Sequence, residues 1–480
     1  MAASFLFYDL ETFGTDPRRS RIAQFAAIRT DADLNQIEEP HDFLVQPADD
    51  LLPSPIATLI TGIEPQRARR EGVNEAEAFA RIYEAMSVPD TCALGYNSLR
   101  FDDEFVRFGL FRNFYDPYER EWRGGNSRWD LLDVMRMARA LRPEGLQWPL
   151  REDGAPSFKL EHLAAANDVR IGDAHEALSD VRALIGIARK LKQAQPKMWE
   201  YALRLRDKRF AARLLDTVSI TPVLHVSQRF PASRLCAAAV APLTRHPHID
   251  NRVIVYDLSE PPDELLALDV DDILDRLYTP VADLPQGIAR IPLKEVHLNR
   301  APILVEWAHL REDELERLQI DPALVLARVE QLRAAGPALA EKIRRVYAGR
   351  PMQPAIDADG ALYDGFLPDA DRKRFPDVRS ASPQILRERD FAFQDPRLQE
   401  LIFRYRARNW PDSLTADEAE RWRGYRRLRL CEDRGMSEYS FERYRAEIAH
   451  LRLAHADDGR AQRLLDALDA WALDVESDLI

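Results

Sequence analysis

Apolar residues in the first part of the chain follow two different spacings. Short apolar runs rich in aromatic and aliphatic side chains predict strands at residues 5–8, 24–29, 42–45 and 92–96. Apolar residues three and four positions apart predict helices over 74–85, from about 101 onward, and over 131–141, 158–166 and 177–192. Three early strands followed by alternating helix and strand indicate an α/β domain, which we place at residues 1–192.

The pattern changes after the last of these helices. Between Thr221 and Glu306 the apolar residues come in short β-like pieces that prolines and turn residues separate. Residues 257–275 carry eight acidic residues and no basic ones, which is typical of a solvated acidic face. We expect a small β-rich domain here and place it at residues 196–349.

A third region begins near residue 350. Residues 350–354 and 356–360 (IDADG) have the composition of a linker. From about Asp369 the pattern is helical, and aromatic and arginine residues interleave in FRYRARNW and RWRGYRRLRL. We place a helical C-terminal domain at residues 352–480.

Composition narrows the class of protein. The 480 residues are 46% hydrophobic, and the formal net charge of −13 excludes a uniformly basic nucleic-acid coat, although not a local basic surface. The three cysteines lie too far apart in sequence for a metal knuckle, and their odd number fits a reducing compartment better than a disulfide framework. No apolar run is long enough to span a membrane, and acidic residues come too early for a signal peptide. We therefore expect a cytoplasmic protein.

The first candidate chemistry is a pair of carboxylates at the end of the first strand. Asp9 and Glu11 are two positions apart in FYDLETFGT, so they share one face of that strand. Two anions this close repel each other, and a hard divalent cation such as Mg²⁺ or Mn²⁺ is their natural partner. Taken alone, however, the D-x-E motif fits a pair of strand-end carboxylates wetted by solvent at least as well.

Further acidic residues downstream make the pattern more specific. Asp102 and Asp103 follow the strand at 92–96 in GYNSLRFDDE, where they also suit a helix N-terminus. His175 precedes the helix at 177–192, and Asp180 lies within that helix. Four residues separate the histidine from the aspartate. The combination of D-x-E, N-x3-F-D and H-x4-D favours a metal-dependent site over isolated surface residues.

These motifs resemble the DEDD exonuclease superfamily, in the subgroup whose fifth residue is histidine. Longer segments, among them FLFYDLETFGTDP, LGYNSLRFDDEF and NSRWDLLDVMR, are similar to the bacterial exonuclease I family, and the similarity runs over nearly the whole chain. The resemblance implies an α/β, ribonuclease-H-like exonuclease domain with a mixed sheet, followed by an SH3-like β-rich domain and a helical domain. It also implies hydrolysis of single-stranded DNA from the 3′ end, with release of 5′-mononucleotides, in DNA repair and recombination.

The resemblance assigns roles to individual residues. Two Mg²⁺ ions, or Mn²⁺ in their place, are expected in the active site, and His175 is the expected general base. Asp103 is the alternative at the third motif, although the pattern N-x3-F-D selects Asp102. The expected catalytic and metal-binding carboxylates are Asp9, Glu11, Asp102 and Asp180.

The DNA contacts implied by the resemblance are less distinctive in sequence. Lys159 stands where the family has an arginine, so the positive charge is kept and the planar fork is lost. Basic residues in a run such as RLRDKRFAAR usually form a solvated face, and Arg107 also suits an ordinary amphipathic helix. The expected substrate-binding residues are Glu11, Lys159, Arg107, Lys208, Lys294 and Asn299.

The family also implies a protein partner. Its members bind the acidic, apolar C-terminal tail of the single-stranded-DNA-binding protein in a basic pocket, and Arg311 lies in a segment similar to that pocket. Thr221 occupies a position where a lysine is expected, which is a departure from the family pattern. We expect a monomer that binds single-stranded DNA and this tail and has no membrane partner.

Two other interpretations stay open at this point. Another histidine-type DEDD enzyme, such as a polymerase-proofreading subunit or an oligoribonuclease, has the same carboxylates, but such enzymes are usually much shorter. A binding or scaffold protein with an inactive nuclease domain is the second alternative. All five chemical positions are filled, which argues against it, because clustered carboxylates carry a desolvation cost that a structural role does not require.

Overall fold

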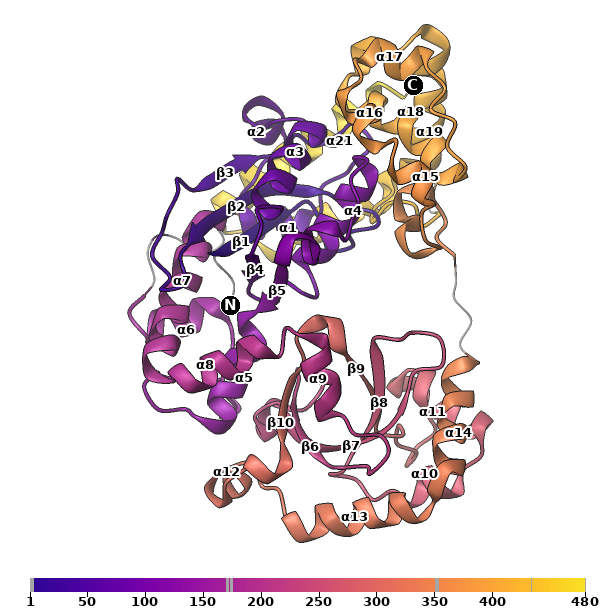
Figure 1. Ribbon diagram of the computed structural model, residues 1–480. Coiled ribbons are helices and arrows are strands. Elements are labelled where there is room, and N and C mark those ends of the chain that lie inside the picture. Colours follow the sequence, from indigo (N-terminus) through magenta and orange to yellow (C-terminus); the bar gives the residue numbers. More distant parts are fainter. Residues whose placement is uncertain (1–3, 170–171, 173–175, 350–353, 433, 480) are drawn as a thin grey trace. The chain divides into compact units, whose positions relative to one another are not determined.

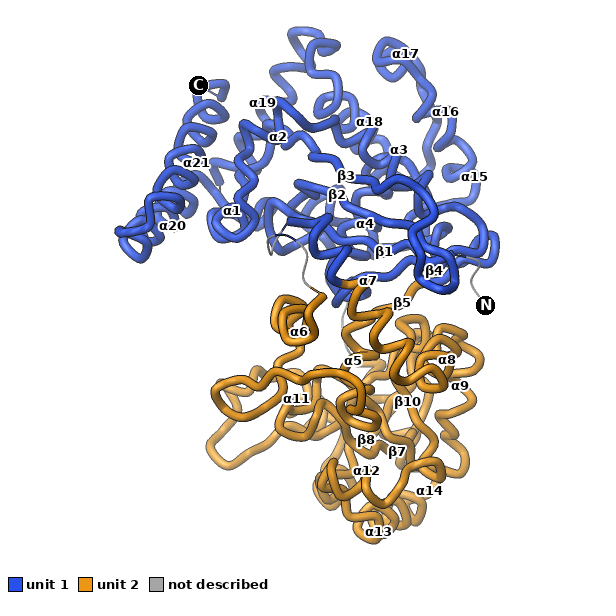
Figure 2. The backbone as a smooth tube through the Cα atoms, turned by 90° about the vertical axis from the view of Figure 1, so that its left-hand side faces the viewer, with its two compact units in different colours: residues 1–127, 171–183, 353–480 blue, residues 128–170, 184–352 orange. Residues whose placement is uncertain are grey.

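The computed structural model of the chain describes residues 4–169, 172, 176–349, 354–432 and 434–479 (Figure 1). The chain divides into two compact units, coloured separately in Figure 2. Unit 1 comprises residues 1–127, 171–183 and 353–480, and unit 2 comprises residues 128–170 and 184–352. Each unit is described by itself below.

A five-stranded mixed sheet forms the centre of unit 1, in the order β3-β2-β1-β4-β5. Strand β1 pairs antiparallel with β2 and parallel with β4, which confirms the predicted mixed sheet. The four predicted strands are confirmed, whereas β5 escaped prediction because Trp129 is the only apolar residue among its four. The strands are β1 (Ser4–Thr12), β2 (Ile22–Thr30), β3 (His41–Leu44), β4 (Thr91–Gly95) and β5 (Ser127–Asp130), the last of which crosses the unit boundary.

Two helices, α3 (Glu75–Met86) and α4 (Asp102–Arg112), cover one face of this sheet. Alternate residues of β1, including Leu6, Tyr8 and Leu10, pack into the same apolar cluster as side chains of both helices. The two helices approach closely at Gly109 of α4, where a Cβ atom would overlap the ring of Phe79 from α3. Asp9 and Glu11 lie on the opposite face of β1.

The helical C-terminal region belongs to unit 1 and packs on its N-terminal helices. Helices α20 and α21 contact α1, and the indole nitrogen of Trp471 donates to the carbonyl oxygen of Leu51 at 3.0 Å. These contacts confirm the predicted helical C-terminal region. Its helices and the two N-terminal ones are α1 (Pro55–Thr61), α2 (Pro65–Glu71), α15 (Asp369–Arg372), α16 (Phe375–Ser380), α17 (Pro383–Glu388), α18 (Pro396–Asn409), α19 (Ala416–Leu430), α20 (Phe441–Ala454) and α21 (Gly459–Ser477).

A buried ionic cluster joins the same two regions, and we call it the paired cluster. Arg408 of α18 contacts both Asp50 and Asp359, and Arg21 contacts Asp359 at 3.1 Å. Burial alone would raise the pKa of Asp50 and of Asp359, but the surrounding guanidinium groups bring the pKa of each carboxyl well below its ordinary value. The cluster consists of Asp50, Asp357, Asp359, Arg21, Arg404, Arg408 and Arg429.

The paired cluster corrects one prediction from the sequence. Residues 356–360 were expected to form a linker, but Asp359 has no exposed surface and lies in the short helix η7 (Ala358–Tyr363). The acidic residues of IDADG look like solvent-facing turn residues in sequence, because their arginine partners lie far away along the chain. The other expected linker, residues 350–354, falls almost entirely outside the described residues.

Unit 2 contains a five-stranded antiparallel sheet in the order β10-β6-β7-β8-β9. The predicted β-rich middle region is thereby confirmed, although β7 was not predicted because it begins with three alanines, which have low β-propensity. The strands are β6 (Val223–Val226), β7 (Ala237–Arg245), β8 (Arg252–Asp257), β9 (Leu293–His297) and β10 (Ile303–Glu306).

Helices make up more of unit 2 than the sequence analysis expected. The acidic run at 257–275 forms α10 and α11, whose Leu265 and Ile273 enter the core while most of the carboxylates are exposed, as expected for a solvated acidic face. The helices are α5 (Leu131–Leu141), α6 (Leu160–Ala166), α8 (Pro196–Arg204), α9 (Lys208–Leu214), α10 (Asp263–Ala267), α11 (Val270–Tyr278), α12 (Glu312–Arg317), α13 (Pro322–Ala334) and α14 (Gly336–Ala348). One more helix, α7 (Ala177–Ala194), begins in unit 1 and ends in unit 2.

Predictions about membrane spans, cysteines and domain boundaries were also made from the sequence. Within the described ranges, every helix is too short or too polar to cross a bilayer. All three cysteines are free thiols, two of them buried. The domain boundaries at 192, 196–349 and 352 stay predictions, because the two compact units group the chain differently.

Candidate active site

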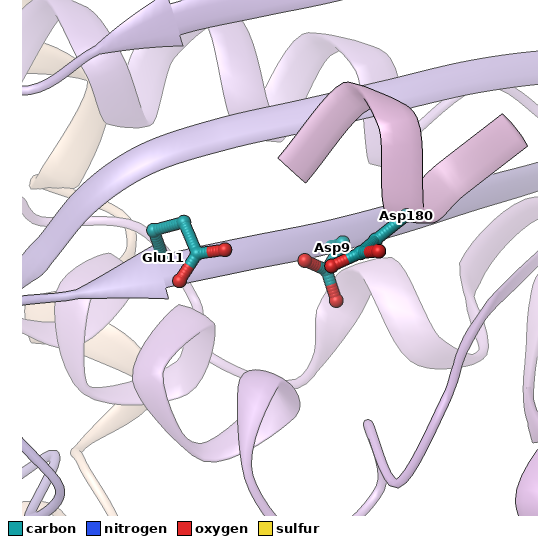
Figure 3. A group of neighbouring side chains, drawn as sticks. All are labelled: Asp9, Glu11 and Asp180. Carbon is teal, nitrogen blue, oxygen red and sulfur yellow. The ribbon is translucent and has the colours of Figure 1, made fainter. Parts of the chain in front are cut away.

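Three carboxylates from two elements of unit 1 lie together (Figure 3). Asp9 and Glu11 come from β1, and Asp180 comes from the first turn of α7. One oxygen from each carboxylate lies within 4.8 Å of the other two. Asp9 and Asp180 are half-buried, and Glu11 is buried. The structure therefore brings together three of the four acidic residues that the sequence singled out, as one group of potential ligands.

The strand pairing explains why this edge of the sheet is open to a site. The parallel ladder between β1 and β4 ends at the pair Phe7 and Leu94, so β1 continues beyond its neighbour on that side. Asp9 and Glu11 lie in this continuation, on the face opposite Tyr8 and Leu10. The side chains at the carboxyl end of β1 can thus converge with residues that follow β4.

Asp102 is the first acidic residue after β4. It is the first residue of α4, and the carboxyl ends of two parallel strands meet at the same edge of a sheet. Its charge raises the pKa of both Asp9 and Glu11, so it acts on these two carboxylates at short range. We call Asp9, Glu11, Asp102 and Asp180 together the acidic cluster.

The electrostatics of the acidic cluster are those of like charges in a buried place. Burial first, and then the charges of Asp102, Glu11 and Asp180, raise the pKa of Asp9 well above its ordinary value. Burial, Asp180 and Asp102 raise the pKa of Glu11 to about 8. The charges that the described residues exert on these two groups all come from carboxylates. Among the described residues, the neighbouring charges that act on Asp9 and Glu11 therefore add to the cost of burial and do not offset it.

A divalent cation fits this set of donors. The ligand atoms are carboxylate oxygens only, which suits hard ions such as Mg²⁺ and Mn²⁺ rather than ions that prefer sulfur or imidazole. A bound cation would also supply positive charge and favour the ionised form of each carboxylate. The composition and electrostatics of the cluster make it the candidate site for a divalent cation.

The neighbouring Asp103 has a different environment, which decides between the two candidates at the third motif. Its Oδ1 accepts a hydrogen bond from the hydroxyl of Tyr8 at 2.8 Å and one from the guanidinium of Arg120 at 2.6 Å. The side chains of Arg120 and Asp103 are 0% and 1% exposed. Asp103 is thus neutralised by a buried partner, while the charge of Asp102 acts on the acidic cluster. Arg120 lies in the short helix η1 (Glu119–Glu121), and its pairing with Asp103 could not be predicted from the sequence.

His175, the expected general base, lies outside the described residues. The residue five positions later, Asp180, is described, and its amide donates to the carbonyl oxygen of Glu176 at 3.0 Å. That bond places Asp180 at the start of a regular helix. Of the H-x4-D motif, the structure therefore describes the aspartate, and the role of His175 is part of the proposal below.

Arg107 was expected to contact substrate, but its surroundings are those of a structural arginine. It is 5% exposed, and its guanidinium donates to Glu121 through Nε at 2.7 Å and through Nη2 at 3.0 Å. Its Nη1 donates to Glu104 at 3.1 Å and to the hydroxyl of Tyr363 at 3.2 Å. These bonds occupy the guanidinium within the protein, so we do not retain Arg107 among the DNA contacts.

The other four expected DNA contacts belong to unit 2 and are more accessible. Lys159 precedes α6, its side chain is 71% exposed, and its Nζ lies 3.3 Å from Glu161. Lys208 is the exposed first residue of α9. Lys294 of β9 is half-buried, with its Nζ against the Nε2 of His225 and 5.1 Å from the ring of Phe230. Asn299 is exposed in the short helix η5 (Leu298–Arg300).

Arg311, the expected partner-binding residue, belongs to a group of arginines in unit 2. It precedes α12, its side chain is 62% exposed, and its Nε lies 3.8 Å from Glu314. Arg142 at the end of α5 also contacts Glu314, and Arg317 donates to the carbonyl oxygen of Ala140 at 3.1 Å. Burial and the charges of Arg311 and Arg317 lower the pKa of Arg142. We call Arg142, Arg311 and Arg317 the basic cluster, of which the sequence analysis had found only Arg311.

Comparison with known proteins places the whole chain among similar sequences. Family models described as exonuclease, exonuclease I SH3-like domain and exonuclease I C-terminal domain match residues 6–188, 206–349 and 356–475. The exodeoxyribonuclease I of Escherichia coli (strain K12) is 44% identical over 474 residues, which cover 98% of each chain. These matches confirm the expected order of an exonuclease region, an SH3-like region and a separate C-terminal region.

Solved structures agree with the sequence comparison. The exonuclease I of Methylocaldum szegediense, described as moderately thermophilic, is 46% identical, with a TM-score of 0.94 over 98% of this chain and 99% of that one. The zinc-bound form of an E. coli exonuclease I complex with single-stranded DNA is 43% identical, with a TM-score of 0.94 over 99% of this chain and 100% of that one. The similarity therefore extends through both compact units and includes a relative seen with metal and with DNA.

Proposed function

The chain belongs to the exonuclease I family, and from this premise we propose that the acidic cluster hydrolyses single-stranded DNA from its 3′ end. The activity is that of the full-length relatives, and their nearly complete coverage sets aside the shorter proofreading and oligoribonuclease alternatives. The observation that carries the proposal is the acidic cluster itself, whose raised carboxyl pKa values call for a cation. A scaffold role gives no reason for buried carboxylates whose charges raise the pKa of Asp9 and Glu11.

We propose two Mg²⁺ ions, or Mn²⁺ in their place, as the cofactors. Asp9, Glu11, Asp102 and Asp180 would hold them, because they offer the hard oxygen donors that these ions prefer. Divalent cations in such a site neutralise the charge of the scissile phosphate and favour ionisation of water near neutral pH. The donor set supports a divalent cation, and the choice of Mg²⁺ is part of the proposal.

The protein side of the reaction needs a base and a means to hold the strand. We propose that His175 accepts the proton of the attacking water, since an imidazole near its ordinary pKa suits that task at neutral pH. The negative charge of the acidic cluster does not bind a phosphate directly, so basic residues elsewhere must hold the strand. The reaction releases a 5′-mononucleotide and needs no covalent enzyme intermediate.

An assay on labelled oligonucleotides tests this function. A single-stranded DNA labelled at its 5′ end should shorten stepwise from the 3′ end in Mg²⁺, with 5′-mononucleotides as the product and no reaction in chelator. Single-stranded RNA of the same sequence and duplex DNA with blunt ends serve as the comparison substrates. Release of internal fragments, or preference for RNA, would contradict the proposal.

The role of His175 is tested by a matched pair of variants. His175→Gln should lower turnover at neutral pH by about 100-fold, which is within the range for loss of a general base. His162→Gln is the control, because His162 is a half-exposed histidine of α6 outside the proposed chemistry. Full turnover in His175→Gln would remove the histidine from the mechanism.

We propose Lys159, Lys208, Lys294 and Asn299 as contacts to the DNA strand. Their support is the positive charge or amide they present and the exposure of three of them. Each lysine that contacts a phosphate adds counterion release, so replacing it by methionine should lower the salt dependence of binding by about 0.7 in the slope of log K against log salt. Lys159→Arg should bind at least as well as the wild type if the side chain meets a phosphate, because arginine restores the planar fork.

We also propose that the basic cluster binds the acidic C-terminal tail of the single-stranded-DNA-binding protein. The charges of Arg311 and Arg317 lower the pKa of Arg142, and an acidic tail would add carboxylates to this group of positive charges. Arg311→Ala should weaken binding of a synthetic tail peptide about 10-fold. Arg344→Ala is the control, since Arg344 is a half-exposed arginine of α14 that pairs with Glu341. Equal peptide binding by both variants would contradict this assignment.

The remaining expectations concern the cell. We propose that the protein acts in the cytoplasm as a monomer, in DNA repair and recombination. The three free cysteines support a reducing compartment. Light scattering of the purified protein tests the monomer, and fractionation of cells that express it tests the compartment.

A further inference from the structure

The loop that follows the catalytic strand is held by a side chain from the far end of the sequence. Oε1 of Glu438, in the segment between α19 and α20, accepts hydrogen bonds from the amides of Thr15 at 2.8 Å and of Asp16 at 2.5 Å. More than 400 residues separate the partners. The carboxylate of Glu438 thus satisfies two adjacent backbone donors of the loop.

Gly14 gives a second and independent sign of this contact. A Cβ atom built on Gly14 would overlap the carboxylate of Glu438. The backbone of Gly14 is in an ordinary conformation, so the requirement for glycine comes from the space that Glu438 occupies and not from a positive φ. The loop and the glutamate therefore fit each other closely.

Other C-terminal residues hold the remainder of the same loop. Arg429 of α19 donates to the carbonyl oxygen of Arg19 at 2.8 Å, and Asp359 pairs with Arg21 at 3.1 Å. Arg112 of α4 donates to the carbonyl oxygen of Pro17 at 3.0 Å. Most of the side chains that fix this loop thus come from the C-terminal region, which sequence alone assigns to a separate domain.

The end of β1 depends on what holds this loop. The register between β1 and β2 shifts between Glu11 and Thr12, so the regular ladder is interrupted at the catalytic glutamate. Beyond it, the hydroxyl of Thr12 donates to the carbonyl oxygen of Gly14 at 2.6 Å. The direction of Glu11 is therefore set partly by the ladder before it and partly by the loop after it.

We propose that Glu438 is a positioning residue of the exonuclease reaction: by fixing the loop at Gly14–Asp16 it holds Glu11 in the acidic cluster. The proposal rests on the function proposed above. It makes the C-terminal region part of the support of the active site, since residues that hold ligands in place commonly affect metal affinity and activity about 10-fold or more. Glu438 itself touches neither metal nor substrate in this account.

Two variants of Glu438 separate positioning from bulk and charge. Glu438→Ala removes both hydrogen bonds to the loop, and we expect Mn²⁺ binding, measured by electron paramagnetic resonance without DNA, to weaken about 10-fold. We expect kcat to fall by a similar factor while KM for DNA is unchanged. Glu438→Gln keeps an oxygen that can accept both bonds and should restore most of both values. Glu432→Ala is the control in the same segment, because Glu432 is exposed and pairs with Arg434.

A double-mutant cycle with Gly14 makes the test decisive. Gly14→Ala should weaken Mn²⁺ binding as Glu438→Ala does, because its methyl group displaces the carboxylate. Adding Gly14→Ala to Glu438→Ala should cost nothing further, because the space is then free. Additive effects, or a lower unfolding temperature with unchanged Mn²⁺ affinity and kcat, would overturn the proposal. An inactive wild-type protein that still binds Mn²⁺ would instead count against the proposed function.

Discussion

Unit 1 contains two buried groups of carboxylates that differ in one respect. In the paired cluster, Asp50 and Asp359 face arginines, and the pKa of each carboxyl lies well below its ordinary value. In the acidic cluster, Asp9 and Glu11 face other carboxylates, and the pKa of each lies above its ordinary value. Burial acts in the same direction on all four groups, so the neighbours decide the outcome.

The difference shows which buried charges serve stability and which serve function. The paired cluster is complete within the chain and ties the C-terminal helices to the N-terminal part of unit 1. In the acidic cluster the neighbouring carboxylates of Asp9 and Glu11 add to the cost of burial, and a bound cation would offset that cost. Four predictions test this contrast.

The largest effect is expected from Asp9→Asn. The variant should lose about a thousandfold or more in turnover, which corresponds to about 4 kcal/mol of transition-state stabilisation. In chelator its unfolding temperature should be no lower than that of the wild type, because a repelling charge has been removed. Turnover on labelled single-stranded DNA and a thermal melt check the two halves. A variant that is active, or that melts earlier in chelator, breaks the contrast.

The opposite result is expected from Asp359→Asn. This change leaves buried guanidinium groups without their partner and should lower the free energy of unfolding by about 3–5 kcal/mol. The Mn²⁺ affinity of the folded fraction should fall far less than it does in Asp9→Asn, because Asp359 is not a member of the acidic cluster. Asp474→Asn is the control, since Asp474 pairs with Arg69 on the surface and should change the free energy by less than about 1 kcal/mol. Denaturant unfolding with and without Mn²⁺ measures both.

Asp102 and Asp103 offer the contrast in two consecutive residues. Asp103→Asn should lower the free energy of unfolding by about 3 kcal/mol, because Arg120 loses its buried charge partner. Asp102→Asn should leave the stability in chelator intact and remove Mn²⁺ binding. Calorimetric titration with Mn²⁺ and denaturant unfolding of the two variants decide the matter. Exchanged outcomes would mean that Asp103 is the ligand.

The fourth prediction concerns pH. Because the pKa of Glu11 is about 8 in the folded, metal-free protein and 4.5 ordinarily, the folded state keeps a proton that the unfolded chain releases between these values. The free energy of unfolding in chelator should therefore fall as pH rises from about 4.5 to about 8, by at most about 1.4 kcal/mol per pH unit for each retained proton.

A variant and a metal control sharpen that pH profile. Glu11→Gln should flatten the part of the decline that Glu11 contributes, and saturating Mg²⁺ should reverse the trend because binding needs the ionised carboxylates. Thermal melts across this pH range measure each case. Identical profiles for the wild type and Glu11→Gln in chelator would show that Glu11 titrates normally.

Much of the fold and most of the acidic cluster could be predicted from the sequence. The strand that carries Asp9 and Glu11 has a strong local pattern, and alternation along a strand places both on one face. The spacing H-x4-D likewise identified Asp180. These predictions succeeded because each depends on residues that are close together in the chain.

Predictions failed where the deciding partner is distant. Spacing favoured Asp102 over Asp103 only through a family pattern, whereas the physical reason is Arg120, which a sequence scan does not connect to either residue. Residues 356–360 resembled a linker because the arginines that bury Asp359 come from positions 21 and 408. Glu438 carried no signal at all, since its partners are backbone amides.

Gly109 shows how far such dependence can extend. Helix α4 begins with Asp102 and lies against Phe79 through the one position where a side chain has no room. Even the smallest replacement, alanine, would have to lift the helix from α3 or turn the aromatic ring aside. A search for substitutions that abolish nuclease activity should therefore include this glycine. It lies about two helical turns after Asp102, outside the catalytic motifs.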